Sequence, residues 1–237
     1  MYTVLGSSGL IGGHMLAVLR RDGEDVRAPG RDELGRLPEN LGHVIYCIGL
    51  TADFRERPFA TVEAHVSLLA GLLQRHQYAS FTYLSATRFY RHAGSTSEDA
   101  APMVQPDDAD QLYDLSKLTG ESLVLHASDG RGRVVRLANV FGPDYQSPLF
   151  LPTVLRQAAT TGHVIFQTSP DSAKDYVSVE DVAAILPPIA TQGRRPIYNL
   201  SSGTATTNRE IAEILAAEGI TVAFADGAPA VTHPAID

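Results

Sequence analysis

The chain has 237 residues, of which 44% are hydrophobic and 19% charged, and its formal net charge at pH 7 is −8. This length can bury one sizeable core, and the acidic balance argues against binding to nucleic acid or to an anionic membrane surface. No apolar run approaches the roughly 20 residues that span a bilayer. The N-terminus shows no secretion signal, and the single cysteine, Cys47, excludes an internal disulfide framework, so a reducing, cytoplasmic location is predicted.

Strand-like and helical patterns alternate along the first part of the chain, which is typical of βαβ units with a parallel sheet. A strand is predicted at 2–6, followed by a helix that ends at Gly23 and has an apolar face of Ile11, Met15, Val18 and Leu19. A second helix is indicated by apolar residues spaced by 4, 3 and 4 positions: Val62, Val66, Leu69 and Leu73. Further strands are predicted at 25–29, 43–50, 80–86 and 132–140.

The pattern changes after residue 143, where a helix is expected over 148–162 and strands at 163–168 and 196–200. Two more helices begin with capping boxes, in which a hydroxyl and an acidic side chain three residues later cap the first turn: Ser178 with Asp181, and Thr207 with Glu210. The sequence therefore predicts an α/β protein with a Rossmann-like, doubly wound parallel sheet. Residues 1–140 form its larger region, with strand and helix returns from 164–200, and residues 141–237 form a smaller part.

A glycine-rich segment, GSSGLIG, lies between the first predicted strand and the first helix. Gly6 permits the tight turn, Gly9 lets the backbone approach a pyrophosphate, and Gly12 lets the helix pack closely on the strand. The amides at the helix start then face anionic phosphates, so cofactor contacts are also expected at Ser8, Leu10 and Ile11. A plain tight turn is the alternative, and the position between strand and helix favours dinucleotide binding.

The end of the second predicted strand bears on which dinucleotide is bound. An acidic residue there hydrogen-bonds the adenosine ribose of NAD, whereas an arginine accommodates the 2′-phosphate of NADP. Ala28 and Pro29 are not acidic, and Arg27 and Arg31 flank the turn, which tilts the prediction towards NADP with Arg31 as a contact. Asp32 is so close that a shift of one residue reverses this choice, and solvated arginines are the alternative. Both NAD and NADP stay open.

Tyr113 and Lys117 stand four residues apart in the segment YDLSK, between the strands 80–86 and 132–140, and are neighbours on one helical face. A tyrosine with its ordinary pKa of about 10 is protonated at neutral pH, and a nearby ammonium group lowers that pKa by stabilising the phenolate. Such a phenol can give or take the hydroxyl proton during hydride transfer. An exposed helical face explains the spacing equally well, and the glycine-rich segment is what favours the catalytic interpretation.

At this point the chain resembles the extended short-chain dehydrogenase/reductases of the NAD-dependent epimerase/dehydratase type. The resemblance rests on six segments in order: GSSGLIG (6–12), FTYLSATRFY (81–90), Tyr113-x-x-x-Lys117, RLANVFGP (136–143), KDYVSVEDVA (174–183) and YNLSSG (198–203). It implies NAD(P) binding by residues 1–140 and a nucleotide-activated sugar as the substrate of residues 141–237, which form a minimal or truncated substrate-binding part. It also implies that Tyr113 is the general acid/base, that Lys117 binds the nicotinamide ribose and lowers the tyrosine pKa, and that a homodimer is possible.

Other site residues follow from the same resemblance. Cofactor contacts are implied at Gly49, Leu50 and Leu137. Asn139 would line the substrate diphosphate region, and Lys174 would hold the substrate nucleotide where relatives have an arginine, although a point charge replaces a planar fork. The usual hydroxyl for the reacting oxygen falls at Ala86, which cannot act, so the candidates are Thr87, which would also bind substrate, and Ser85. Hydroxyls that merely bond backbone at a strand end are the alternative.

The segment ATRFY also bears on the reaction type. Nucleotide-sugar 4,6-dehydratases follow the catalytic threonine with Asp-Glu, and this chain has no such carboxylate pair, so that reaction is disfavoured. An epimerase or a keto-sugar reductase remains. A dinucleotide-binding sensor or scaffold without catalysis is the competing class, favoured by Ala86 and opposed by Tyr113 and Lys117. The eight histidines lack paired-ligand spacing, so no metal site is predicted, and Cys47 is expected to be a buried, inert thiol.

Overall fold

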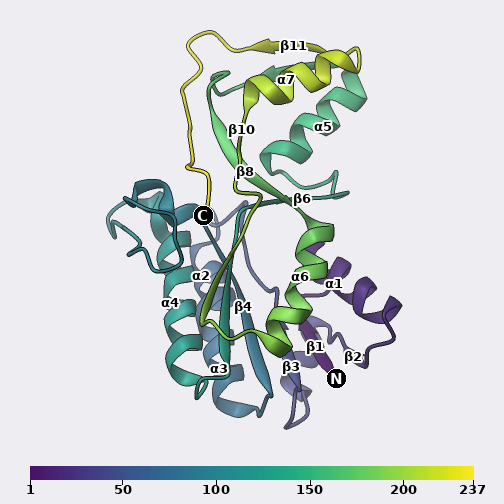
Figure 1. The fold of residues 1–237 in the computed structure, drawn as a ribbon, viewed down its shortest axis with the longest axis vertical. Helices are drawn as coiled ribbons and strands as arrows, with labels where there is room; N and C mark the ends of the chain where they lie inside the picture. The colour runs from purple at the N-terminus through teal and green to yellow at the C-terminus, as the bar shows by residue number, and fades with distance from the viewer.

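Six parallel strands form the central sheet in the computed structural model of the protein, which describes residues 1–237 (Figure 1). They are arranged in the order β2-β1-β3-β4-β5-β9 and are Val26–Arg27, Tyr2–Leu5, His43–Tyr46, Ser80–Ala86, Gly132–Leu137 and Ile197–Leu200. The order reverses between β1 and β3, because the chain first adds β2 on one side and then β3 on the other. Ligands of doubly wound sheets bind at the carboxyl ends of the strands at such a point.

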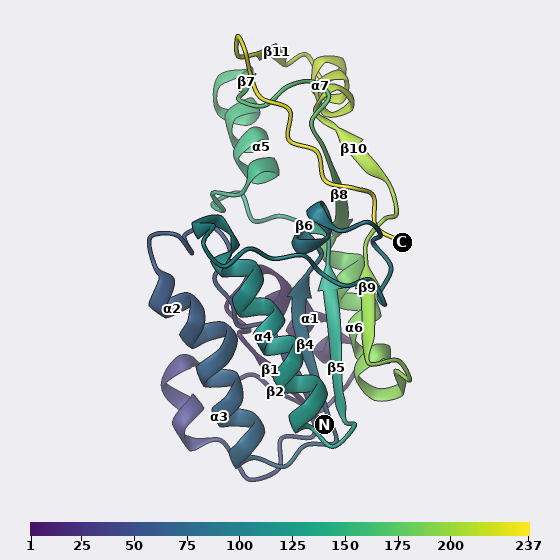
Figure 2. The same cartoon turned by 90° about the vertical axis from the view of Figure 1, so that its left-hand side faces the viewer.

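Helices cover both faces of this sheet (Figure 2). One face holds α1 (Leu10–Arg21) and α6 (Val179–Gln192), whose apolar residues pack with those of β1, β3, β4 and β5. The other holds α2 (Pro58–Val62), a π-helical turn (Glu63–Ser67), α3 (Leu68–Arg75) and α4 (Leu112–Ala127). Both faces are buried, which explains why the central strands are almost continuously apolar.

A smaller lobe lies beyond the carboxyl ends of the central strands (Figure 1). It contains the three-stranded sheet β10-β8-β6, the parallel pair β11 and β7, and two helices with a core of their own. These elements are β6 (Asn139–Phe141), α5 (Phe150–Thr161), β7 (His163–Phe166), β8 (Ala173–Ser178), β10 (Ala205–Thr207), α7 (Asn208–Ala217) and β11 (Thr221–Phe224). The C-terminal tail then returns towards the larger region, where Ile236 packs with Phe89 and Tyr90.

The predicted fold class is confirmed, and the differences have local causes. The predicted strand 132–140 divides at Ala138: β5 stays in the central sheet, and β6 joins the sheet of the smaller lobe. The predicted strand 43–50 ends at Tyr46, so that Cys47–Leu50 form a loop at the sheet edge. Both capping boxes are confirmed in part or in full, since Ser178 accepts from the Asp181 amide and Thr207 and Glu210 cap each other's backbone. No helix is both long and apolar enough to cross a membrane.

Candidate active site

The glycine-rich segment forms a tight turn between β1 and α1. Gly6 has a φ of +88°, and a Cβ there would lie 2.9 Å from the Cys47 carbonyl carbon, so only glycine fits without strain. A Cβ on Gly12 would overlap the Gly6 carbonyl oxygen, which confirms that Gly12 allows the close approach of helix and strand. Gly9, the N-cap of α1, is exposed and faces no such contact.

The first turn of α1 is suited to hold an anion. No side chain caps it and it contains no acidic residue, so the amides of its first turn have no side-chain partner. Exposed Ser8 and Gly9 and half-buried Leu10 and Ile11 surround these amides. A pyrophosphate would be stabilised there by hydrogen bonds and by the helix dipole, so the segment fits the dinucleotide predicted from the sequence.

The loop after β3 lies beside the predicted catalytic lysine. A Cβ added to Gly49 would stand 3.3 Å from Lys117 Nζ and 3.2 Å from His65 Nε2. The Leu50 amide donates to the same His65 nitrogen at 3.2 Å. The structure therefore brings Gly49 and Leu50 together with Lys117, as expected for residues that line one end of a cofactor.

Tyr113 and Lys117 are both buried on the first turns of α4. The Lys117 Nζ atom lies 5.9 Å from the centre of the Tyr113 ring and donates to the Leu84 carbonyl at 2.9 Å. Burial lowers the pKa of Lys117 to about 7, although the Glu121 carboxylate acts in the opposite direction. Lys117 is thus divided between its charged and neutral forms near neutral pH.

The pKa of Tyr113 differs from the sequence expectation. In the protein alone burial raises it to about 12, with contact to the Thr51 side chain opposing the rise and Asp114 adding to it. The predicted lowering by Lys117 is absent, because the ammonium group is directed at the Leu84 carbonyl and desolvation of the phenolate prevails. Tyr113 is therefore a neutral phenol at physiological pH, which is the form that donates a proton.

A buried histidine, His65, links the loop after β3 to α4. Because His65 Nε2 accepts from the Leu50 amide, its Nδ1 carries the proton and donates to Ser116 Oγ at 2.8 Å. The Ser116 hydroxyl in turn donates to the Tyr113 carbonyl at 2.8 Å. Burial lowers the pKa of His65 to about 2, so His65 is neutral at physiological pH and keeps its hydrogen bonds to Leu50 and Ser116. The π-helical turn Glu63–Ser67 places the ring at this position.

The two candidate hydroxyls at the end of β4 have different surroundings. The Thr87 amide and hydroxyl both donate to the Leu137 carbonyl, at 3.0 and 3.3 Å, which is the backbone role foreseen as the alternative. The buried Ser85 hydroxyl has no hydrogen-bond partner. Thr87 and Leu137 are thereby held together where β4 and β5 end.

The predicted substrate residues lie on the smaller lobe. Asn139 on β6 donates to the Asp175 carbonyl at 2.8 Å, and the half-buried Lys174 on β8 places its Nζ 4.9 Å from the centre of the Phe150 ring. On the nucleotide side, Arg31 is exposed at the start of the 3-10 helix Arg31–Arg36 and makes no side-chain hydrogen bond. One terminal nitrogen of Arg27, Nη1, is buried without a partner.

Two arginines that the sequence pattern did not indicate lie at the start of α4, Arg88 beside Tyr113 and Arg91 beside Asp114. Arg88 lies with its guanidinium carbon 5.6 Å from the centre of the Tyr113 ring and 5.1 Å from that of Phe54. Arg88 and Arg91 both pair with Asp114, at 3.6 and 3.3 Å. Asp114 and Tyr113 are adjacent in the chain, so this pairing positions the start of α4.

A family model described as the NAD dependent epimerase/dehydratase family matches residues 2–201. The chain belongs to this family. No curated protein sequence matches the chain.

The epimerase/dehydratase fold is also that of several solved structures. An NAD-dependent NDP-hexosamine 5,6-dehydratase, TunA, involved in tunicamycin biosynthesis, has 19% identity and a TM-score of 0.80, with 100% of this chain and 88% of that chain covered. RMD from Pseudomonas aeruginosa complexed with NADPH has 22% identity and a TM-score of 0.76, with 98% and 90% covered. A UDP-glucuronic acid 4-epimerase variant from Bacillus cereus, with NAD and a fluorinated UDP-glucuronic acid, has 16% identity and a TM-score of 0.80, with 100% and 90% covered. At these identities the likeness establishes the fold alone.

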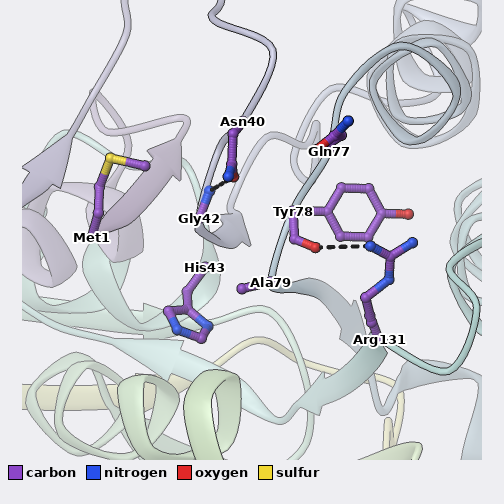
Figure 3. Close-up of a pocket in the computed structure, with 8 residues that line it drawn as sticks. All are labelled: Met1, Asn40, Gly42, His43, Gln77, Tyr78, Ala79 and Arg131. Carbon is purple, nitrogen blue, oxygen red and sulfur yellow. Dashed lines mark hydrogen bonds between the residues drawn. The ribbon is translucent and has the colours of Figure 1, made fainter.

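A polar pocket lies at the amino ends of the central strands, at the edge of the sheet opposite to Gly6 and Gly49 (Figure 3). It is lined by Met1, Asn40, Gly42, His43, Gln77, Tyr78, Ala79 and Arg131. Its polar groups already bond one another, since Arg131 donates to the Tyr78 carbonyl at 3.1 Å and the Gly42 amide to Asn40 at 3.0 Å. Gly6 and Gly49 follow the carboxyl ends of β1 and β3, and Lys117 reaches Gly49 from α4, so the candidate active site lies at this edge of the sheet.

Proposed function

We propose that the protein is an NAD(P)-dependent epimerase or keto-sugar reductase that acts on a hydroxyl or keto carbon of a nucleotide-activated sugar. The observation that supports this most strongly is the position of the buried pair Tyr113 and Lys117. Lys117 reaches the loop at Gly49, at the same edge of the sheet as the turn at Gly6. A helix face with no catalytic role has no reason to bury an ammonium group beside that loop.

The residues divide between the two ends of the cofactor. The turn made by Gly6, Ser8, Gly9, Leu10, Ile11 and Gly12 holds the pyrophosphate, and Gly49, Leu50, Lys117 and Leu137 hold the nicotinamide end. When bound, the dinucleotide supplies the hydride donor or acceptor. Tyr113 donates its proton to the oxygen of a ketone during reduction and takes it back during oxidation. Thr87 or Ser85 orients that oxygen.

The choice between NAD and NADP depends on the arginines at and after β2, which is the edge strand of the central sheet. Arg27 has a buried terminal nitrogen without a partner at the end of β2, and Arg31 is free in solvent nearby in sequence. A 2′-phosphate would give both arginines an anionic partner, which supports NADP. Four of the solved neighbours contain NAD and one contains NADPH, so the neighbours do not add support for NADP.

The proposed substrate class follows from the smaller lobe. Several neighbours were crystallised with UDP sugars, among them UDP-glucose and UDP-glucuronic acid. In this chain Asn139, Lys174 and Thr87 lie near the lobe boundary and would contact the sugar and its diphosphate. Elimination of water in the manner of a 4,6-dehydratase is disfavoured, because the residues after Ala86 are Thr87 and Arg88 rather than two carboxylic acids.

A product assay with purified protein tests the proposal. The protein is incubated with a panel of nucleotide sugars and nucleotide keto-sugars, with NAD(H) or NADP(H), and the sugars are analysed by mass and nuclear magnetic resonance. We expect a change of configuration or of oxidation state at one carbon, dependent on the dinucleotide. Tight dinucleotide binding with no conversion of any sugar would instead support the sensor or scaffold.

A further inference from the structure

We propose that the substrate has a carboxylate close to its reacting carbon, in addition to the phosphates of its nucleotide, and that Arg88 and Arg91 bind this carboxylate. The inference rests on the proposed function, because it concerns the substrate of the same site. It starts from the arrangement of cations around Tyr113.

Arg88 is fixed next to the proposed proton donor. Its guanidinium group lies against the rings of Phe54 and Tyr113, and Nη2 donates to the Asp110 carbonyl at 2.7 Å. The other terminal nitrogen, Nη1, has no protein partner and is not buried, and the side chain is 22% exposed. The group is therefore held in one orientation with a free hydrogen-bond donor near Tyr113.

Among the carboxylates near Arg88 and Arg91, only that of Asp114 is buried, since those of Asp108 and Asp110 are partly exposed. Arg88 and Arg91 share a single carboxylate, that of Asp114, which is only 1% exposed. The Arg91 Nε atom is buried without a partner. Arg55 provides the contrast on the same Phe54 ring, because it pairs one to one with Asp110 in solvent.

Two further basic side chains from other parts of the chain are affected by the charge of Arg88. Lys174 on β8 has its pKa lowered by burial and by the charge of Arg88. His233 in the C-terminal tail has its pKa lowered to about 4 by burial and by Lys174, Arg91 and Arg88. At neutral pH His233 is therefore uncharged, and the charges of Lys174 and Arg88 repel each other although the whole chain has a net charge of −8. Such mutual repulsion at a half-buried place is typical of a binding site for an anion.

The location of the free donor favours a carboxylate on the sugar over the diphosphate. Arg88 contacts Tyr113, so its ligand must be attached close to the carbon whose oxygen Tyr113 protonates. We take C4 as the reacting carbon; the diphosphate of a nucleotide sugar is attached at the anomeric carbon, on the far side of the ring from C4. A planar carboxylate at C6 would be near C4 and would match the planar donors of arginine.

The experiment compares UDP-glucuronic acid with UDP-glucose, which differ only in the carboxylate at C6. Binding of each to the protein saturated with NAD or NADP is measured by calorimetry. We expect the acid to bind at least about tenfold tighter, the effect of one charge-assisted interaction. Arg88→Met should reduce this preference to less than about threefold and leave UDP-glucose affinity within about threefold, whereas Arg88→Lys should keep part of the preference.

Arg55→Met is the matched control, since it removes an arginine from the same aromatic ring and should leave the preference unchanged. Thermal melting of each variant identifies loss of fold. Equal or weaker binding of the acid, an undiminished preference in Arg88→Met, or no binding of either sugar would overturn the inference. A preference for the acid with no conversion of any sugar would contradict the proposed function and leave the carboxylate site standing.

Discussion

Two regions near Tyr113 contain basic side chains in largely buried surroundings. One contains Lys117, and the other contains Arg88 and Arg91. Lys117 has one backbone carbonyl as its partner, and its pKa falls to about 7. The arginines surround one buried carboxylate, that of Asp114. A lysine relieves the cost of burial by losing its proton, whereas an arginine keeps its charge at any physiological pH.

This difference indicates different roles for the two places. Because its pKa is about 7, Lys117 can gain or lose its proton near neutral pH. The arginine charges are permanent, and the only buried carboxylate beside them is that of Asp114, so they can bind an anionic ligand. The chain has only two lysines, Lys117 and Lys174, and one belongs to each place. Because there are only two lysines, the titration of each can be followed separately.

Removal of the Tyr113 hydroxyl should have the largest effect, because Tyr113 contacts both places. Tyr113→Phe should reduce turnover at least about 100-fold while cofactor affinity is retained, since only the proton transfer is lost. Initial rates and dinucleotide titrations measure the two quantities. Tyr145→Phe, at a tyrosine that is 56% exposed, is the control. Unchanged turnover in Tyr113→Phe would show that another group donates the proton.

Lys117 should give the protein a pH-dependent stability above neutral pH. Its pKa is about 7 in the folded state and 10.5 in the unfolded state, so the unfolded chain binds more protons between these values. The free energy of unfolding should therefore rise by about 2 kcal/mol from pH 7 to pH 9. Lys117→Met should lack this rise, as measured by denaturant unfolding at each pH.

The pKa of Lys117 can also be measured directly. With isotope-labelled lysine, nuclear magnetic resonance would show only two side-chain amine signals, which Lys117→Met assigns. We expect the Lys117 signal to titrate near pH 7 in the free protein. Titration near the ordinary value of 10.5 would remove the contrast with the arginines.

His65 should cause a comparable loss of stability on the acid side. Its pKa is about 2 in the folded state and 6.5 in the unfolded state, so the unfolded chain binds more protons as the pH falls below 6.5. Between pH 7 and pH 5 the loss from His65 should be about 2 kcal/mol. His65→Gln should flatten this slope, and His126→Gln, at an exposed histidine, serves as the control. An unchanged slope in His65→Gln would show that His65 is not kept neutral.

Cys47 should give the smallest effect. Burial raises the pKa of its thiol to about 12, so little thiolate exists near neutral pH. Native protein should react with a thiol reagent much more slowly than protein in denaturant, as followed by mass. Fast native modification would show that the loop after β3 opens.

Local signals explain what the sequence could predict. The turn at Gly6 and Gly12, the capping box of Thr207 with Glu210, and the one-turn spacing of Tyr113 and Lys117 each depend on residues close in the chain. The strands β8, β10 and β11 were missed, because each gains its partner from a distant segment, and β10 and β11 are also short.

The missed site residues have the same explanation. His65 is a single histidine in an apolar helical segment, and only the fold brings Leu50 and Ser116 to its two nitrogens. Arg88 and Arg91 form a recognisable pair in sequence, but Asp114, Lys174 and His233 join them only in three dimensions. The rise in the Tyr113 pKa could not be predicted either, since it follows from burial.

Isotope transfer tests the central claim most directly, namely that Tyr113 and Lys117 serve a hydride transfer at one carbon of a nucleotide sugar. A reduced dinucleotide with deuterium at C4 of its ring is mixed with a keto-sugar, or a sugar deuterated at the reacting carbon is mixed with the oxidised form. We predict that the label moves between the nicotinamide ring and that carbon without exchange with water, and that Tyr113→Phe slows this at least about 100-fold. Hydrogen from water at that carbon, or no transfer with any sugar, would contradict the account.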